Sequence, residues 1–305
     1  MSISTPIALP PAAAGRRWQP RRGLYTRGRV GLHVLLLAVC GLWLLPLLWA
    51  VYTSLRPYAD TAEHGYFSLA GGLTLDNYVA ALRDGSLVGH FANSLIIVVP
   101  AVIGVLLLAL MLAFALARFS LRFNLSLLIL FAAGNLLPPH VLVTPLFRLF
   151  LAVPVPPPLS DNGILYDQHL GVVLAHVCFQ LGFCVFVLSS YMKTIPQDIL
   201  DAARIDGASV VQLLRSIVLP LSRPVIAALA ILEATWIYND FLWALVLMQT
   251  AAKQPVTTAL ANISGEFFTD YNRLAATAIL IALPTLVTFL VLRRHFLRGL
   301  ILGSS

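Results

Sequence analysis

The sequence predicts an all-α integral membrane protein with six transmembrane helices. Of its 305 residues, 59% are hydrophobic and only 11% are charged, whereas ordinary soluble domains are about 25% charged. The apolar residues also gather in windows of about 18 or more residues, which is the length that a helix needs to cross a bilayer. Composition and clustering together exclude an ordinary soluble domain.

Six candidate spans follow one another along the chain. They cover residues 31–54, 92–117, 125–149, 170–192, 224–248 and 273–292, and each is long enough for a membrane helix. The stretch before them is rich in Ala, Pro and Arg. We therefore expect a basic, disordered tail over residues 1–30 and a single transmembrane domain over residues 31–303.

Basic residues are distributed unevenly between the two sides of the membrane that alternate loops define. The N-terminal tail, loop 118–122, loop 193–223 and the C-terminus hold fifteen of the twenty Lys and Arg but three of the thirteen Asp and Glu. Lys and Arg in short loops resist translocation. We expect a multi-pass inner-membrane protein with both termini in the cytoplasm, and a net charge of +7 that reflects orientation near anionic lipid, not nucleic-acid binding.

Two segments on the outer side carry their own signals. Residues 55–91 combine the turn signal Gly71-Gly72 with the amphipathic stretch DNYVAAL, which predicts a small helix at the outer surface. Residues 151–168 contain four prolines, at positions 154, 156, 157 and 158. Proline lacks the backbone N–H that a helix needs, so this segment is expected to be an extended loop.

The cytoplasmic stretch 201–220, DAARIDGASVVQLLRSIVLP, is the best organised polar segment of the chain. Thr194 and Gln197 have the spacing of a capping box, and Asp198 and Asp201 favour the positive end of a helix. These signals predict a short helix over about 196–206. Because cytoplasmic loops in membrane proteins are often loose connectors, a defined helix here requires an explanation.

A second helix is expected directly after the first. Gly207 suits the left-handed residue that ends many helices, and Ser209 can cap the next one. Apolar residues then follow helical spacing up to Pro220, which is expected to limit this second helix. Two interpretations remain open at this point: a helical hairpin that only covers the bundle, or a structure that receives force from a partner.

The same stretch resembles a known motif. Asp201-Ala202-Ala203, then Gly207, Ile217, Leu219 and Pro220 are similar to the EAA motif of permease subunits of binding-protein-dependent ABC importers, with Asp in place of the usual Glu. TSLRP (53–57), NSL (93–95), AFALARF (113–119) and YNDFLWALV (238–246) resemble its carbohydrate-uptake branch, the maltose-permease G-like subunits. The chain ends in Gly303-Ser304-Ser305 instead of the common Gly-x-x-Lys-Gly, which leaves the role of its C-terminus open.

This resemblance implies a type I ABC importer permease fold in which the EAA loop, about 193–223, contains a coupling helix. In the family, this helix sits in a cleft of a cytoplasmic ATPase. The implied coupling residues are Asp201, Ala202, Ala203, Asp206, Gly207, Ala208, Ile217, Leu219 and Pro220. The implied partners are a second permease subunit in a heterodimer, two ATPase subunits or domains, and an extracytoplasmic solute-binding protein, with a sugar as the solute.

The sequence also indicates that the energy source lies in another chain. A P-loop needs a Lys preceded by Gly and followed by Ser or Thr, but Lys193 follows Met192 and Lys253 follows Ala252. The sequence also lacks HExxH, GxSxG and paired-Cys signatures. We expect a transport subunit and not an enzyme, without a bound cofactor or metal, while a partner ATPase uses ATP and Mg²⁺.

Polar residues inside the spans are candidates for the translocation path. Ionisable groups at membrane depth usually face a cavity or a partner, and aromatic side chains with nearby acceptors suit sugar rings. The candidates are Glu233, Trp236, Asn239, Asp240 and Trp243 in the fifth span, and Asn135 in the third. The alternative is that these residues satisfy neighbouring helices or mark the membrane interface.

A self-contained transporter is the alternative to the importer subunit. A self-contained secondary transporter or channel would need coupling-ion carboxylates within its spans and often has inverted repeats. Only Glu233 and Asp240 are acidic residues within the expected spans, and no repeat is evident. The importer subunit is therefore the favoured hypothesis.

Overall fold

The computed structural model describes residues 24–84, 87–119, 122–134, 138–263 and 270–301. Within these ranges every regular element is a helix, apart from an isolated bridge between Pro154 and Ile164. The chain divides into two compact units, one up to Trp49 and one from Ala50 onward. The first helix, α1 (Leu24–Ser54), begins inside the stretch expected as a disordered tail, and residues 1–23 lie outside the described residues.

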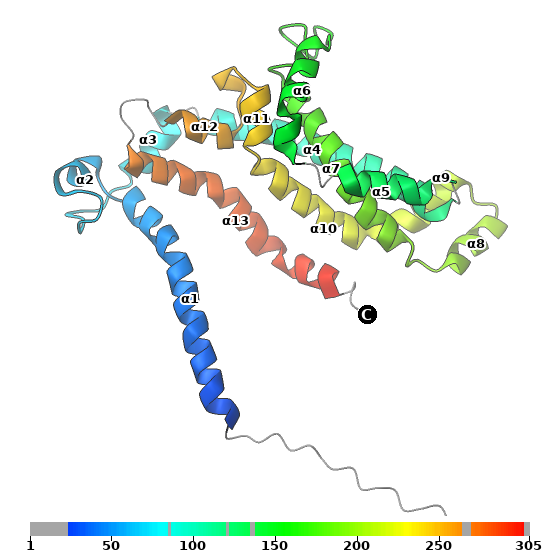
Figure 1. Cartoon of the computed structure of the whole chain (residues 1–305), viewed down its shortest axis with the longest axis horizontal. Coiled ribbons are helices and arrows are strands. Elements are labelled where there is room, and N and C mark those ends of the chain that lie inside the picture. Colours follow the sequence, from blue (N-terminus) through cyan, green and yellow to red (C-terminus); the bar gives the residue numbers. More distant parts are fainter. Residues whose placement is uncertain (1–23, 85–86, 120–121, 135–137, 264–269, 302–305) are drawn as a thin grey trace, which may run out of the picture. The chain divides into compact units, whose positions relative to one another are not determined.

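Five helical stretches among the described residues are long and apolar enough to cross a membrane. They are Arg29–Ser54 in α1, Leu87–Arg118 (α4), His169–Met192 (α7), Val210–Tyr238, which ends in α10 (Leu219–Tyr238), and Tyr271–Val291 in α13 (Tyr271–Ile301). These stretches confirm five of the expected spans in kind and order. Figure 1 shows α4, α7, α10 and α13 as the long helices of the second unit.

The third expected span is not one continuous helix. Residues 125–149 are divided between α5 (Asn124–Gly134) and α6 (Pro139–Ala152). Pro138 is extended, with φ −61° and ψ 125°, because a residue that precedes a proline is disfavoured in the helical region. Pro139 then occupies the first turn of α6, where a missing N–H costs nothing.

The fifth expected span also ends earlier than predicted. α10 stops at Tyr238 with Asn239 as its C-cap, and a separate short helix, α11 (Leu242–Leu247), follows. The predicted span 224–248 therefore contains a break at residues 239–241. This break places the backbone of Asn239 and Asp240 outside regular helix.

α4 and α7 form the most extensive helix pair among the described residues. On α4, the residues Ala101, Val105, Ala109 and Ala113 recur every four positions and are all 0% exposed. Small side chains at this spacing let two membrane helices approach closely. On the α7 side, Cys184, Val185 and Leu188 are equally buried, so the α4–α7 pair forms the central packing of the second unit.

Buried apolar residues form two clusters that position different ends of the second unit. One joins α4 and α7 to Trp243 and Leu247 of α11. The other joins α4 and α7 to Leu200 and Leu213 in the segment after α7. In Figure 1, the short helix α8 (Gln197–Ile205) lies beyond one end of α7 and α10, and α11 and α12 (Val256–Ile263) lie toward the other end.

The two segments expected on the outer side have the local structure that the sequence predicted. DNYVAAL lies in the short helix α3 (Asp76–Asp84), preceded by α2 (Tyr58–His64). Between the end of α6 and the start of α7 there is no regular helix, as expected from the four prolines. A 3-10 turn, Ala251–Lys253, packs close to this proline segment through Lys253.

Candidate functional site

The first helix of the EAA-like segment is α8 (Gln197–Ile205). The predicted capping box at its start is wrong: Pro196 is the N-cap, and the Thr194 hydroxyl donates to the Tyr191 carbonyl at 2.8 Å. The Thr194 side chain therefore bonds to the end of α7 and not to the start of α8. Gln197 instead donates along α8 to the Asp201 carboxylate, at 3.1 Å.

Gly207 ends α8 in the left-handed conformation that the sequence predicted, with φ +85°. The Ala208 N–H donates to the Ala203 carbonyl and the Gly207 N–H to the Arg204 carbonyl, both at 3.0 Å. This pair of bonds is a Schellman motif, which satisfies the last carbonyls of a helix. Nothing lies within 4 Å of where a Gly207 side chain would begin, so the backbone angle alone requires glycine.

The second helix begins at Ser209 with the cap that the sequence predicted. The Gln212 N–H donates to the Ser209 hydroxyl at 3.4 Å, and the Ser209 N–H donates to the Gln212 side chain at 2.7 Å. These reciprocal bonds form a capping box at the start of α9 (Val210–Leu213). The turn between α8 and α9 is therefore fixed from both sides.

The prediction that Pro220 limits this helix is wrong. α9 continues through one π-helical turn (Leu214–Val218) into α10, which holds Pro220 in its first turn. A proline lacks the N–H of a regular helical bond and crowds the preceding turn, and π turns accommodate such a change of register within a helix. Ile217, Leu219 and Pro220 are half-buried at the start of this long helix.

The other residues predicted to couple to an ATPase lie on both sides of the Gly207 turn. Asp201, Ala202, Asp206 and Gly207 are exposed, while Ala203 and Ala208 are half-buried. Leu200, 1% exposed, anchors α8 to the apolar cluster behind it. The structure therefore brings residues 201–208 together on an exposed surface and separates them from the Ile217–Pro220 part of the motif.

Sequence reasoning missed three apolar side chains on the same surface. Ile205, Val210 and Val211 are 86%, 51% and 61% exposed. Exposed apolar side chains that gather on one surface are typical of protein interaction sites. The sequence carried this signal for two of them: Ile205 and Val211 fall outside the helical spacing of the buried residues Leu200 and Leu213, whereas Val210 lies three residues before Leu213.

The candidate path residues do not share one cavity in this structure. Glu233 is fully buried and accepts a bond from the Cys184 thiol at 3.1 Å. Asn239 donates to the Thr235 carbonyl and to the Thr285 hydroxyl. Asn135 lies outside the described residues. Glu233 and Asn239 are thus each hydrogen-bonded to a side chain of another helix.

The two tryptophans differ in exposure. Trp243 is 4% exposed and stacks on Phe179, with ring centroids 4.7 Å apart. Trp236 is 44% exposed and packs at a tilt against Phe183, 5.3 Å away. Of this pair, Trp236 alone presents a large surface outside the packed interior.

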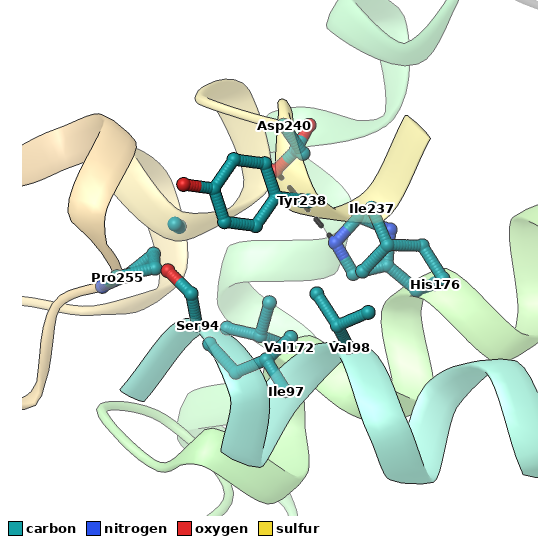
Figure 2. Close-up of a pocket in the computed structure, with 10 residues that line it drawn as sticks. Ser94, Ile97, Val98, Val172, His176, Ile237, Tyr238, Asp240 and Pro255 are labelled. Carbon is teal, nitrogen blue, oxygen red and sulfur yellow. Dashed lines mark ion pairs between the residues drawn. The ribbon is translucent and has the colours of Figure 1, made fainter. Parts of the chain in front are cut away.

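Asp240 lies beside a small cavity, shown in Figure 2. Its Oδ2 atom is 3.7 Å from Nε2 of His176 and accepts the Trp243 N–H at 3.1 Å. The cavity volume is about 10 Å³, with Ser94, Val172 and Tyr238 among its lining residues. Such a volume holds one water molecule at most, so it excludes a sugar ring in this conformation.

A second polar network, missed by the sequence reasoning, surrounds Arg56 in the TSLRP stretch. Arg56 is 1% exposed and donates to the Asp60 carboxylate, at 2.7 and 3.0 Å, and to three backbone carbonyls. Asn77 and Asn272 donate to the Arg56 carbonyl, at 2.8 and 3.1 Å. The guanidinium holds the pKa of Asp60 below its ordinary value, and the network ties α2, α3 and α13 together.

Lys253 joins two outer segments. Its ammonium contacts the Asp161 carboxylate at 2.7 Å and the Asp167 carbonyl at 3.0 Å. This contact lowers the pKa of Asp161 to about 2. Asp167, at φ +60°, accepts the N–H groups of Gln249 and Thr250. The proline segment is thereby held against the chain that follows α11.

Within the described part of the chain, no group of three His, Cys, Asp or Glu side chains has the arrangement of a metal site. The three cysteines are unpaired, and only Cys184 is buried. These observations offer no site for a resident metal among the described residues.

Comparisons with known proteins identify the family. Residues 105–300 match the family described as "Binding-protein-dependent transport system inner membrane component". The chain is 31% identical over 283 residues to the osmoprotective compounds uptake permease protein GgtD of Synechocystis, covering 90% of this chain and 92% of that relative. It is 33% identical over 270 residues to the trehalose transport system permease protein SugB of Mycobacterium tuberculosis, covering 87% and 93%.

A solved structure shares the fold. A chain of a bacterial ABC transporter involved in the import of alginate superposes with a TM-score of 0.75 at 21% identity, covering 91% of this chain and all of that one. The alternative of a self-contained secondary transporter does not fit a family defined by a binding-protein-dependent system. The chain belongs to the family of binding-protein-dependent transport system inner membrane components and is a permease subunit of an ABC importer.

Proposed function

We propose that this permease subunit imports a sugar or sugar-like solute, and that the surface around the α8–Gly207–α9 turn docks on a separate ATPase subunit. The relatives are named for the uptake of trehalose and of osmoprotective compounds, and the solved structure for alginate import. Trehalose and alginate are both carbohydrates, which supports a carbohydrate as the solute class.

The observation that carries the docking proposal is the exposed surface of residues 201–211. It combines the Asp201 and Asp206 carboxylates with the exposed side chains of Ile205 and Val211. A surface with apolar side chains and charges at its edge is suited to a protein partner. The Schellman turn and the capping box keep this surface rigid, and rigidity lowers the entropic cost of docking.

The proposed assembly includes further partners and a defined orientation in the membrane. A second permease chain completes the translocation path as a heterodimer, two ATPase subunits or domains hydrolyse ATP with Mg²⁺, and an extracytoplasmic binding protein delivers the solute. Both termini and the α8–α9 turn face the cytoplasm, as the distribution of Lys and Arg favours. The coupling loop extends over about 193–223 within the membrane domain.

Direct contact with the solute is proposed for part of the candidate path. Trp236 and Asn239 have exposed surface in this conformation, so they are the first candidates to meet a solute at the interface with the second permease chain. Glu233 and Trp243 are buried and Asp240 is half-buried, so they would reach a solute only after the helices packed around them move apart. Asn135 remains a candidate on sequence grounds alone.

Recovery of partner proteins tests this proposal. The tagged chain is extracted from its native host in mild detergent, and co-purifying proteins are identified by mass spectrometry. We expect an ATPase and a second multi-span chain, and we expect Ile205→Glu to lose the ATPase alone. A matched control is Leu69→Glu, because Leu69 is 92% exposed and far from residues 201–211 in sequence.

Transport completes the test. Uptake of labelled carbohydrates is measured in cells that carry or lack the gene for this chain. Normal uptake of every carbohydrate in the absence of the chain would contradict the solute class. Recovery of the unaltered chain without an ATPase under several gentle conditions would contradict the docking proposal.

A further inference from the structure

Arg118, the last residue of α4, contacts three neutral acceptors on the segment that leads into α8. Its Nη2 atom donates to the Met192 carbonyl and, at 2.9 Å, to the Ile195 carbonyl. Its Nη1 atom donates to the Gln197 side chain at 3.1 Å. The last carbonyls of a helix have no partner within the helix, so Arg118 joins the end of α7 and the start of α8 to α4.

This contact extends to the motif carboxylate. Gln197 accepts from Arg118 with its carbonyl oxygen and donates with its amide nitrogen to Asp201, at 3.1 Å. Arg204 donates to the same carboxylate oxygen at 2.9 Å. A continuous chain of hydrogen bonds therefore leads from Asp201, on the exposed surface, to the end of a membrane span.

We infer that Arg118 is a positioning residue that transmits movement of α8 to α4 through Gln197. This inference rests on the proposed docking of α8 on an ATPase. A guanidinium has a fixed planar fork of donors, so it can hold two carbonyls and a side chain in one geometry. Because α4 packs along α7 through small buried residues, a displacement of its end is carried into the central helix pair.

Apolar packing at Leu200 offers α8 a second anchor to the same helices. Variants of the polar chain leave Leu200 in place, so they separate the two routes. Arg118→Lys keeps a charge that reaches the α7 carbonyls but loses the fork, and Gln197→Leu keeps the size but removes both hydrogen bonds. Arg122→Gln is the matched control, because Arg122 is an exposed arginine in the same loop.

Hydrogen exchange tests the link without a partner. In the purified full chain, amides of residues 197–205 are expected to exchange at least about tenfold faster in Arg118→Lys and Gln197→Leu, because each substitution removes at least one hydrogen bond to a charged group. The double variant should exchange no faster than the single variants, because both substitutions break one chain of bonds. Unchanged exchange in both single variants would overturn the inference.

Transport tests the transmission. In the assembled importer, solute transported per ATP hydrolysed is expected to fall by between about twofold and thirtyfold in both single variants, with the ATPase still bound and Arg122→Gln unaffected. If the amides of residues 197–205 exchange faster but the solute transported per ATP hydrolysed is unchanged, the transmission step is overturned. If the unaltered chain recruits no ATPase, the docking proposal fails and the transmission step fails with it, whereas the link itself is decided by hydrogen exchange.

Discussion

Two Arg–Asp pairs, one at Arg56 and one at Arg204, show how burial changes the role of the same interaction. Arg56 and Asp60 lie one helical turn apart in sequence, and their side chains are 1% and 14% exposed. Arg204 and Asp201 have similar spacing, but their side chains are 40% and 51% exposed. Their N–O distances, 2.7 and 2.9 Å, are nearly equal.

The difference teaches that distance alone does not indicate what a pair contributes. Removal of one partner from a buried pair leaves an unpaired polar group that costs several kcal/mol, whereas an exposed pair is worth about 1 kcal/mol or less. Arg56 therefore has a structural role in the segment that contains α2 and α3. Asp201 can exchange its partners at low cost, which suits a carboxylate on a docking surface.

Removal of Arg56 is the largest expected effect on stability. Arg56→Met should lower the free energy of unfolding by about 3 kcal/mol, because it leaves Asp60 and three backbone carbonyls without their donor. The thermal unfolding midpoint of the purified chain in detergent measures this loss. Arg83→Met, at an exposed arginine of α3, is the control. Equal midpoints for the two variants would contradict the structural role of Arg56.

Substitution of Gly207 tests the rigidity of the exposed region. Gly207→Val forces a β-branched residue into the left-handed region, a strain of about 1–3 kcal/mol. Solute uptake is expected to be lost while membrane insertion is kept. Gly207→Asn is expected to retain most uptake, because Asn tolerates this conformation. Normal uptake by Gly207→Val would show that transport does not depend on this turn.

Substitution of Asp201 separates stability from function. Asp201→Asn should change the free energy of unfolding by less than about 1 kcal/mol, because the pair with Arg204 is exposed. ATPase recovery should nevertheless decrease if the carboxylate meets a basic group of the partner. Thermal unfolding and co-purification are measured on the same preparation. A large loss of stability in Asp201→Asn would show that Asp201, like Arg56, has a structural role. The difference between the buried and the exposed Arg–Asp pair would then disappear.

The smallest effect on stability is expected from removal of the Asp161–Lys253 pair. The folded pKa of Asp161, about 2, lies below its ordinary value of 3.8. Its contribution to stability is therefore complete above about pH 3.8 and is lost as the pH falls toward 2. The thermal midpoint between these pH values should fall less steeply in Asp161→Asn than in the unaltered chain. Identical pH profiles would show that the pair contributes nothing.

The sequence alone determined the class of the fold and, within the EAA-like segment, the helix end at Gly207 and the helix cap at Ser209. Five spans follow from runs of apolar residues, because a bilayer admits only helices whose backbone bonds are satisfied internally. Gly207 and Ser209 were predicted in their observed roles, since a helix end and a helix cap depend on neighbouring residues only. The resemblance to the EAA motif rests on the twenty residues 201–220.

The tertiary structure decided what local patterns leave open. The continuation of the second helix past Pro220 depends on the π turn at Leu214–Val218, which accommodates the missing N–H within the packed bundle. The burial of Arg56 and the link from Arg118 to Gln197 join residues that are distant in sequence. A spacing rule predicts contacts within one helix, but burial and long-range hydrogen bonds arise only when helices pack against one another.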